Sequence, residues 1–282
     1  MSRSLRRHLQ HSGLPIGGIA VALMLSTSAL LDVPVSMALL GAAFCGTALV
    51  YLADRALGHS PEDAINRPDR VTWRRSMRGW IAGEGMALAV GLAVCLPFLH
   101  GRTLLGAMGI GTVAGLHVGV PGHDAWRLKR WGRLKPLAIS GAWAVGAVLL
   151  PVLEADAPWA LGVGALIAYR LALILPNVLM ADWRDRPGDA VHGVSTLSYR
   201  WQRRTVQHVG WMCLGLATLG ALLVAGRSVA LAPLLVVDAV GLLLMGVALH
   251  RLRPRHTPMH MIVLDVLVAW PLVTWIVARV LA

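Results

Sequence analysis

Three carboxylates lie close together directly after a long apolar run of the sequence. Asp182, Asp185 and Asp189 follow the run at 159–181 and fall within eight residues. On a helix, spacings of three and seven residues would put all three on one face, whereas the proline and glycine between the last two would also suit a turn that gathers them. Carboxylate oxygens are preferred ligands of Mg²⁺, which often bridges one or two of them to the phosphates of a substrate. The segment therefore predicts a magnesium site at the mouth of a membrane helix.

A second acidic segment occurs nearer the start of the chain. It contains the acids Asp54, Glu62, Asp63 and Asp69 and the arginines Arg55, Arg67 and Arg70. Asp54 and Asp63 are nine residues apart, so a straight helix would direct them to different faces. The chain between them must fold back if both acids are to hold the same ion.

The composition is that of an integral membrane protein. Of the 282 residues, 56% are apolar and only 14% are charged, whereas roughly a quarter of a soluble domain is charged. Apolar runs long enough to cross a bilayer lie at 14–31, 35–53, 79–99, 103–121, 136–153, 159–181, 206–225, 229–249 and 262–281. The sequence therefore predicts an all-α, polytopic membrane protein, with about nine transmembrane helices in one domain, 1–282.

The formal net charge of +12 would suit either a nucleic-acid-binding protein or the charge bias of membrane topology. Most Lys and Arg residues gather on alternate connections, namely the N-terminal tail and the loops near 54–78, 122–135, 182–205 and 250–260. Positive charge favours the cytoplasmic side of a membrane. We therefore expect a bacterial-type inner membrane protein with its N-terminus and active-site loops in the cytoplasm and its C-terminus outside. Topology accounts for the charge, so no nucleic-acid partner is expected.

The order of residues in both acidic segments matches motifs of a known family. The second segment has Asp182, Asp185, Gly188, Asp189, Gly193, Thr196 and Leu197, in the pattern D-x-x-D-x-x-G-D followed by G-x-x-T-L. The first contains Tyr51-Leu-Ala-Asp54-Arg55 and ends in Asp63-Ala-Ile-Asn-Arg-Pro-Asp-Arg70, in the pattern D-A-I-N-x-P-x-R. These segments resemble the motifs of the UbiA superfamily of intramembrane aromatic prenyltransferases, which includes UbiA-type terpene cyclases. The family pattern begins with Asn-Asp, where this chain has Val50-Tyr51. Leu134-Lys135-Pro136 resembles the family segment whose lysine contacts diphosphate.

The resemblance implies an enzyme that ionises an isoprenyl (allylic) diphosphate with Mg²⁺ and transfers the isoprenoid chain to a small aromatic acceptor in the lipid bilayer. The implied metal ligands are Asp182, Asp185 and Asp189 for one ion, and Asp54 with Asp63 or Glu62 for another. The implied substrate-binding residues are Tyr51, Arg55, Arg70 and Lys135, and Asn177 is added because it lies just ahead of Asp182 in the sequence. Asp54, Lys135, Asp182 and Asp185 would be the catalytic residues.

Other interpretations stay open. In a terpene cyclase the substrate's own double bond captures the cation, and aromatic side chains in the cavity would favour that activity. A non-catalytic scaffold or transporter would suit the altered first motif. The three aspartates of the second segment could simply pair with Arg184, Arg186 and Arg200. Charged residues inside membrane spans mark functional positions or interhelical pairs; here they are Glu84, His117, Arg170, Asp238 and Asp265.

Overall fold

The structure is a computed structural model that describes residues 8–57, 63–118, 134–159, 161–191, 201–226, 228–251 and 257–281. Its helices, in chain order, are α2 (Leu14–Leu31), α3 (Met37–Leu57), α4 (Asp63–Asn66), α5 (Pro68–Ser76), α6 (Arg78–Cys95), the short 3₁₀ helix η1 (Leu96–Phe98), α7 (Gly101–Val118), α8 (Lys135–Glu154), α9 (Leu161–Val191), α10 (Arg203–Ala225), α11 (Ala232–Arg251), α12 (Thr257–Val268) and α13 (Pro271–Leu281). These residues contain no strand, which confirms the predicted all-α class.

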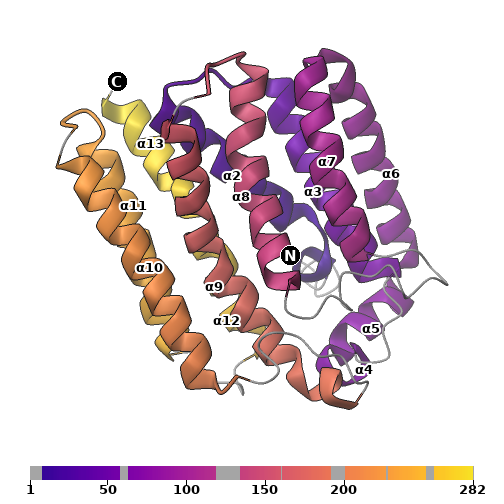
Figure 1. The fold of residues 1–282 in the computed structure, drawn as a ribbon. Coiled ribbons are helices and arrows are strands. Elements are labelled where there is room, and N and C mark those ends of the chain that lie inside the picture. The colour runs from indigo at the N-terminus through magenta and orange to yellow at the C-terminus, as the bar shows by residue number, and fades with distance from the viewer. Residues whose placement is uncertain are drawn as a thin grey trace.

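The long helices stand side by side as a bundle (Figure 1). Within the described part of the chain, eight segments are long and apolar enough to cross a membrane. They match eight of the nine expected spans, and the last of them is interrupted between α12 and α13, just before Pro271. The one remaining expected span, 103–121, corresponds to α7. This helix is less apolar because Arg102 lies in its first turn, yet it packs against α8 within the bundle. The prediction of about nine membrane helices is therefore close to the structure.

The helices differ in how far the bundle encloses them. In α2, which contacts α3, α8 and α13, 56% of the apolar span is buried, whereas only 6% of the α6 span is buried. α6 instead exposes apolar side chains such as Met86, Val90 and Val94. An exposed apolar face of this size suits contact with lipid chains rather than with water.

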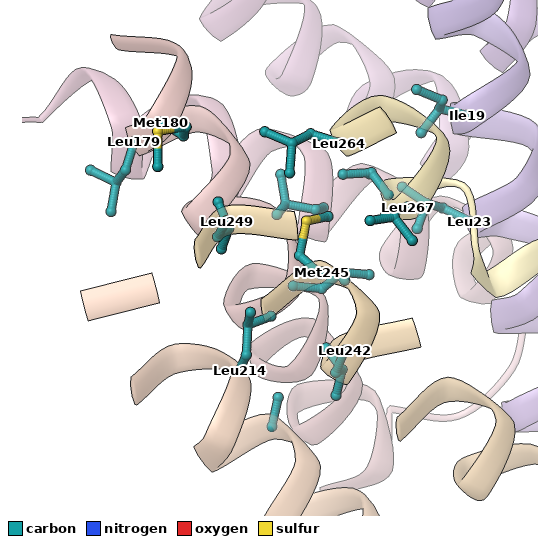
Figure 2. Close-up of a cluster of buried hydrophobic side chains, with 14 of the residues drawn as sticks. Ile19, Leu23, Leu179, Met180, Leu214, Leu242, Met245, Leu249, Leu264 and Leu267 are labelled. Carbon is teal, nitrogen blue, oxygen red and sulfur yellow. The ribbon is translucent and has the colours of Figure 1, made fainter. Parts of the chain in front are cut away.

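The main apolar core joins six helices, α2, α8, α9, α10, α11 and α12, and sets the position of α9 and α12 (Figure 2). Its most deeply buried side chains are Leu23 of α2, Leu179 of α9, Leu214 of α10, Leu242, Met245 and Leu249 of α11, and Leu264 of α12. Close packing of such side chains resists sliding or rotation of one helix against another. Polar residues carried by α9 and α12 are thereby held in register.

A buried polar cluster also holds the bundle together. Arg170 of α9 lies 3.3 Å from Asp238 of α11 and donates a 2.6 Å hydrogen bond to Ser26 of α2. The hydroxyl of Thr274 in α13 donates to the other carboxylate oxygen of Asp238. Four helices thus meet at one ion pair, and for Asp238 the interpretation as an interhelical pair is confirmed.

The residues that precede α2 dock on α5 and α6. His8 Nε2 lies 2.7 Å from Glu84 Oε2, and the backbone N–H of Gly13 donates to the other oxygen of Glu84 at 3.1 Å. Trp73 of α5 is fully buried and donates its indole N–H to His8 Nδ1 at 3.3 Å. The carboxylate of Glu84 is therefore occupied by His8 and by the Gly13 backbone, which join the start of the chain to α6.

Candidate functional site

The acidic end of α9 faces the start of α8. Lys135 Nζ lies 2.5 Å from Asp182 Oδ1, and only 13% and 6% of the two side chains are exposed. Lys135 opens α8, and Pro136 suits the first turn because a helix has no partner for an N–H there. No side chain caps this helix start, so its backbone N–H groups add to the positive charge of Lys135.

The second carboxylate oxygen of Asp182 takes no part in this ion pair. Asp182 Oδ2 is buried and has no hydrogen-bond partner within the part of the chain that the structure describes. Asp185 and Asp189 also lie within electrostatic reach of Lys135. A buried carboxylate oxygen without a donor is costly. The site is therefore suited to receive a further cation at Asp182.

Asp185 is held by two arginines. Arg67, between α4 and α5, donates through Nε and Nη2 at 3.3–3.4 Å, and Arg184 donates through Nε at 3.2 Å. Arg184 Nη2 is buried without a hydrogen-bond partner among the described residues. A buried donor and a buried acceptor are thus both left unsatisfied, at Arg184 and at Asp182. Such a combination can accommodate an anion together with its counter-cation.

Asn66, the last residue of α4, docks the first acidic segment onto the second. Its Nδ2 donates to the backbone carbonyl of Asp185 at 2.7 Å, and its Oδ1 accepts from the backbone N–H of Gly188 at 2.8 Å. The two ends of one amide therefore bind the same turn of α9. This contact brings α4, α5 and the C-terminal end of α9 together at one end of the bundle (Figure 1).

The same contact lies where α9 continues to Val191 through a proline and a glycine. Pro187 has no N–H and cannot contribute to the helical hydrogen bonds. Asn66 adds two side-chain hydrogen bonds on either side of this proline, to Asp185 C=O and from Gly188 N–H. Of the two arrangements open from the sequence, the structure has the helix.

The expected magnesium ligands are only partly brought together. In the described residues, no group of three Asp, Glu, His or Cys side chains is close enough to hold a metal ion. Asp189 is buried in α9, and Asp54 is half-buried in the last turn of α3, within reach of the charge of Arg55. Glu62 and the side chain of Asp63 lie outside the described part of the chain. Both magnesium assignments stay predictions.

The alternative for the three aspartates, simple ion pairing, holds in part. Asp185 pairs with Arg184, as that alternative expected, and also with Arg67. Asp182 pairs with Lys135, which was not among the partners considered. Arg186 instead donates to the backbone carbonyl of Trp201 at 3.2 Å. Arg200, the third arginine considered, lies outside the described residues.

Tyr51 and Arg55 line α3 one turn apart. Trp143 of α8 donates its indole N–H to the Tyr51 hydroxyl at 3.1 Å, and the two rings meet edge to face with centroids 6.1 Å apart. The Arg55 guanidinium lies over the Tyr51 ring, 5.6 Å from its centroid, and donates to the backbone carbonyl of Ser12 at 2.6 Å. Arg70 lies within electrostatic reach of Arg55. Two expected diphosphate contacts, Arg55 and Arg70, therefore share one region.

Asn177 lies deeper in the bundle. Its Nδ2 donates to Asp265 Oδ1 of α12 at 3.2 Å, while its own Oδ1 is buried with no donor among the described residues. Asp265 is half-buried and lies within electrostatic reach of Arg55 and Arg184. Asn177 is thus placed between the acidic end of α9 and a membrane-embedded acid.

The sequence did not identify several residues that complete this region. These are Asn66, Arg67 and Trp143, together with Asp265 as a member of the site. The D-A-I-N-x-P-x-R pattern contained Asn66 and Arg67, and that was the available signal for them. Trp143 carried none, because nothing in the spacing of the tryptophans shows which of them faces the site.

No protein-family model and no curated protein matches this sequence. The structure, however, is similar to solved membrane proteins over nearly its whole length. A UbiA homologue from Archaeoglobus fulgidus, bound to DMAPP and Mg²⁺, has a TM-score of 0.61 at 11% identity, covering 96% of this chain and 99% of that one. An apo UbiA homologue from Aeropyrum pernix K1 has a TM-score of 0.64 at 12% identity, covering 92% and 98%. A structure of digeranylgeranylglyceryl phosphate synthase has a TM-score of 0.58 at 16% identity, covering both chains completely.

These likenesses agree with the expectation drawn from the two acidic segments. They extend over the entire bundle and therefore include the end where α4, α8 and α9 meet. The chain has the all-helical membrane fold of the UbiA homologues.

Proposed function

We propose that this protein is a member of the UbiA superfamily that ionises an isoprenyl diphosphate with magnesium and transfers the isoprenoid chain to a small aromatic acceptor. The observation that carries the proposal is the buried Lys135–Asp182 pair at the polar end of an apolar bundle. Asp182 keeps one oxygen without a donor in the described part of the chain, and α4 supplies further polar groups at the same end. Anion-binding and cation-binding groups thus meet where an amphiphilic substrate could enter from the membrane.

The residues present fit a magnesium ion. Asp182 offers a buried oxygen without a partner in the described structure, and Asp185 and Asp189 continue the same helix. The metal would supply positive charge to neutralise the pyrophosphate as it leaves. Asp54 and Asp63 would hold a second ion at the end of α3.

The cations of the chain would bind the diphosphate oxygens. Lys135 is nearly buried, so its attraction for an anion is weakly screened by solvent. Arg67 and Arg184 already lie at Asp185, while Arg55 and Arg70 approach from the first acidic segment. Negative charge that develops on the leaving group would be stabilised in place, with little reorganisation of the site.

The solved homologues support this chemistry. Structures of the Archaeoglobus fulgidus homologue were determined with DMAPP and Mg²⁺ and with GPP and Mg²⁺. Both organic ligands are allylic diphosphates with isoprenoid chains. The apolar helices of this chain would enclose such a tail and keep water from an allylic cation. The loops that carry Arg and Lys would face the cytoplasm of a bacterial-type inner membrane.

A terpene cyclase is the second candidate. Tyr51 and Trp143 form an aromatic pair next to the polar end of the bundle. Aromatic faces attract cations, so such a pair could stabilise a carbocation while the substrate folds on itself. No acceptor would then be needed.

The test is release of pyrophosphate by the detergent-purified protein with magnesium, across allylic diphosphates of increasing length, with and without aromatic acceptors. The variant is Asp182→Asn, which keeps the size of the side chain. The matched control is Asp156→Asn, because Asp156 is an exposed ion-pair partner of Arg102 at the far end of α7 and α8. We expect release that requires magnesium and falls at least about 100-fold in Asp182→Asn, the usual loss when a group that stabilises transition-state charge is removed.

The products then separate the candidates. Release that depends on an aromatic acceptor, with a prenylated product, supports the transferase. A cyclic hydrocarbon without any acceptor selects the cyclase. If the folded wild-type protein releases no pyrophosphate and binds none, both enzymatic functions are wrong and a scaffold or transporter is left.

A further inference from the structure

We propose that Asp265 is the base that takes the proton released when the allylic cation is captured. This inference rests on the proposed function and assigns a role to a membrane-embedded acid of α12 that neither acidic motif contains. Three features of Asp265 support it: its partners, its depth in the bundle and its difference from the other membrane-embedded aspartate, Asp238.

The position of Asp265 is fixed by the packing of α12. Leu264 and Leu267, on either side of it in the sequence, are buried in the main core (Figure 2). Asp265 itself is only half-buried and turns toward α9, where Asn177 donates to its Oδ1 at 3.2 Å. An amide donor orients a carboxylate without neutralising it. The carboxylate is thus held in place and keeps its basic character.

Asp265 and its neighbours lie deeper in the bundle, further into the membrane-spanning part than the polar end. Along α9, Asn177 precedes Asp182 by five residues, which is about 7.5 Å at the rise of an α-helix. Along α8, Trp143 follows Lys135 by eight residues, about 12 Å. Tyr51 lies on α3 before Asp54, and the electrostatic reach of Asp265 includes both Tyr51 and Arg55. A diphosphate bound at Lys135 would therefore direct its first carbon toward this level.

The two membrane-embedded aspartates have different surroundings. Both oxygens of Asp238 are occupied, by Arg170 and by Thr274, and its charge is neutralised by an ion pair. Asp265 has no Lys, Arg or His partner within ion-pair distance among the described residues, and its bond from Asn177 is to a neutral group. An acid that only joined helices would not need an uncompensated carboxylate near Tyr51 of the aromatic pair. Charged groups inside a membrane are costly and mark functional positions by default.

The reaction would proceed in three steps: ionisation, bond formation and proton loss. The bond between C1 and the diphosphate oxygen breaks, and pyrophosphate leaves with the electron pair. A π bond of the acceptor, or of the substrate's own chain, supplies two electrons to form the new carbon–carbon bond and leaves a cationic adduct. The adduct loses a proton to the Asp265 carboxylate, and the electrons of the broken C–H bond restore the π system. The neutral acid returns the proton to water before the next turnover.

Asn177 is a positioning residue in this scheme. Its Nδ2 sets the orientation of Asp265, and its buried Oδ1 faces no donor from the described residues. A hydrogen-bond donor on the acceptor, such as a phenolic hydroxyl, would satisfy that oxygen. The site would thus favour acceptors that carry a hydroxyl group over bare hydrocarbons.

The experiment compares wild type, Asp265→Asn and Asp265→Glu, with Asp238→Asn as the matched control for loss of a buried membrane acid. Pyrophosphate, coupled or cyclised product, and the prenyl alcohol formed by water are measured in the same reaction. In Asp265→Asn we expect pyrophosphate release within about threefold of wild type but a ratio of product to pyrophosphate at least about tenfold lower, because a missing general base costs 10²–10⁴ in the proton-transfer step alone. Asp265→Glu should recover part of that ratio, and Asp238→Asn should leave it unchanged.

Each remaining outcome decides the matter. An unchanged product ratio in Asp265→Asn, or a proportional loss of pyrophosphate and product, overturns the proposal, since neither separates ionisation from deprotonation. If Asp265→Asn does not fold, Asn177→Ala keeps the carboxylate and removes its orientation; the product ratio should then fall with unchanged KM for the diphosphate, and an unchanged ratio refutes the role. A wild-type protein that releases no pyrophosphate at all refutes the proposed function instead.

Discussion

The contact between Asn66 and α9 predicts how strongly the first acidic segment contributes to diphosphate binding. Asn66→Ala removes two hydrogen bonds, to Asp185 C=O at 2.7 Å and from Gly188 N–H at 2.8 Å. Each such bond contributes about 1 kcal/mol net, so the docked position of α4 should lose about 2 kcal/mol. Arg67, the next residue, would then spend more time away from Asp185.

The loss of docking converts directly into an apparent affinity. When only the docked state binds, the apparent dissociation constant rises in inverse proportion to the docked fraction, up to about 30-fold for 2 kcal/mol. The assay is the Kd of inorganic pyrophosphate with magnesium, measured by calorimetry. Hydrogen exchange of α4 backbone amides in the same variant reports the docking itself.

The matched control is Ser76→Ala. Ser76 donates to the carbonyl of Thr72 within α5, so this change removes a nearby hydrogen bond without touching α9. The control should bind pyrophosphate like wild type. Faster exchange in Asn66→Ala with an unchanged Kd would refute the coupling between α4 docking and binding. Unchanged exchange would show that the two hydrogen bonds do not hold α4.

Three further predictions concern the ion pairs and the packing. Lys135→Met should raise the Kd of magnesium pyrophosphate at least about tenfold, because a charge-assisted hydrogen bond contributes 1.5–3 kcal/mol; an equal Kd by calorimetry would contradict this. Asp238→Ala leaves the Arg170 charge buried without its partner and should lower the free energy of unfolding in detergent by about 3–5 kcal/mol. Adding Arg170→Met should restore most of that free energy, and a double variant no more stable than Asp238→Ala would contradict this. Gly13→Ala should destabilise the protein by about 1–3 kcal/mol, because the added Cβ would lie 1.9 Å from a backbone oxygen of α3. The control Gly18→Ala, whose Cβ would face open space, should not destabilise it, and equal melting temperatures of the two variants would disprove the prediction.

The membrane helices and the acidic face of α9 could be predicted because each depends on local sequence. A run of apolar residues long enough to cross a bilayer forms a helix whatever its neighbours are. The spacing of Asp182, Asp185 and Asp189 determines their common face once α9 is helical. What the spacing left open was whether the helix would continue past Pro187; the residue that binds α9 at this point, Asn66, is more than 100 residues away in the sequence.

The partners of these residues could not be predicted, because they depend on how the bundle closes. Asn66 bonds to a residue 119 positions away, and Asn177 bonds to one 88 positions away. The sequence marked Asp265 as an acid inside a span but gave no reason to place it next to Asn177. A distant contact leaves no spacing pattern, and only the relative rotation of α9 and α12 in the main core brings the two side chains together.

The pairing of acids with cations has a consequence for how ligands would bind. Lys135 and Asp182 neutralise each other in a nearly buried setting. A diphosphate that attracted Lys135 away would leave a bare buried carboxylate, and a divalent cation at Asp182 would leave a bare ammonium group; either change costs several kcal/mol. When both ligands arrive together, each freed side chain gains a new counter-ion of opposite sign. The same reasoning applies to Asp185 with Arg67 and Arg184, so the site should favour the metal–diphosphate complex over either component alone.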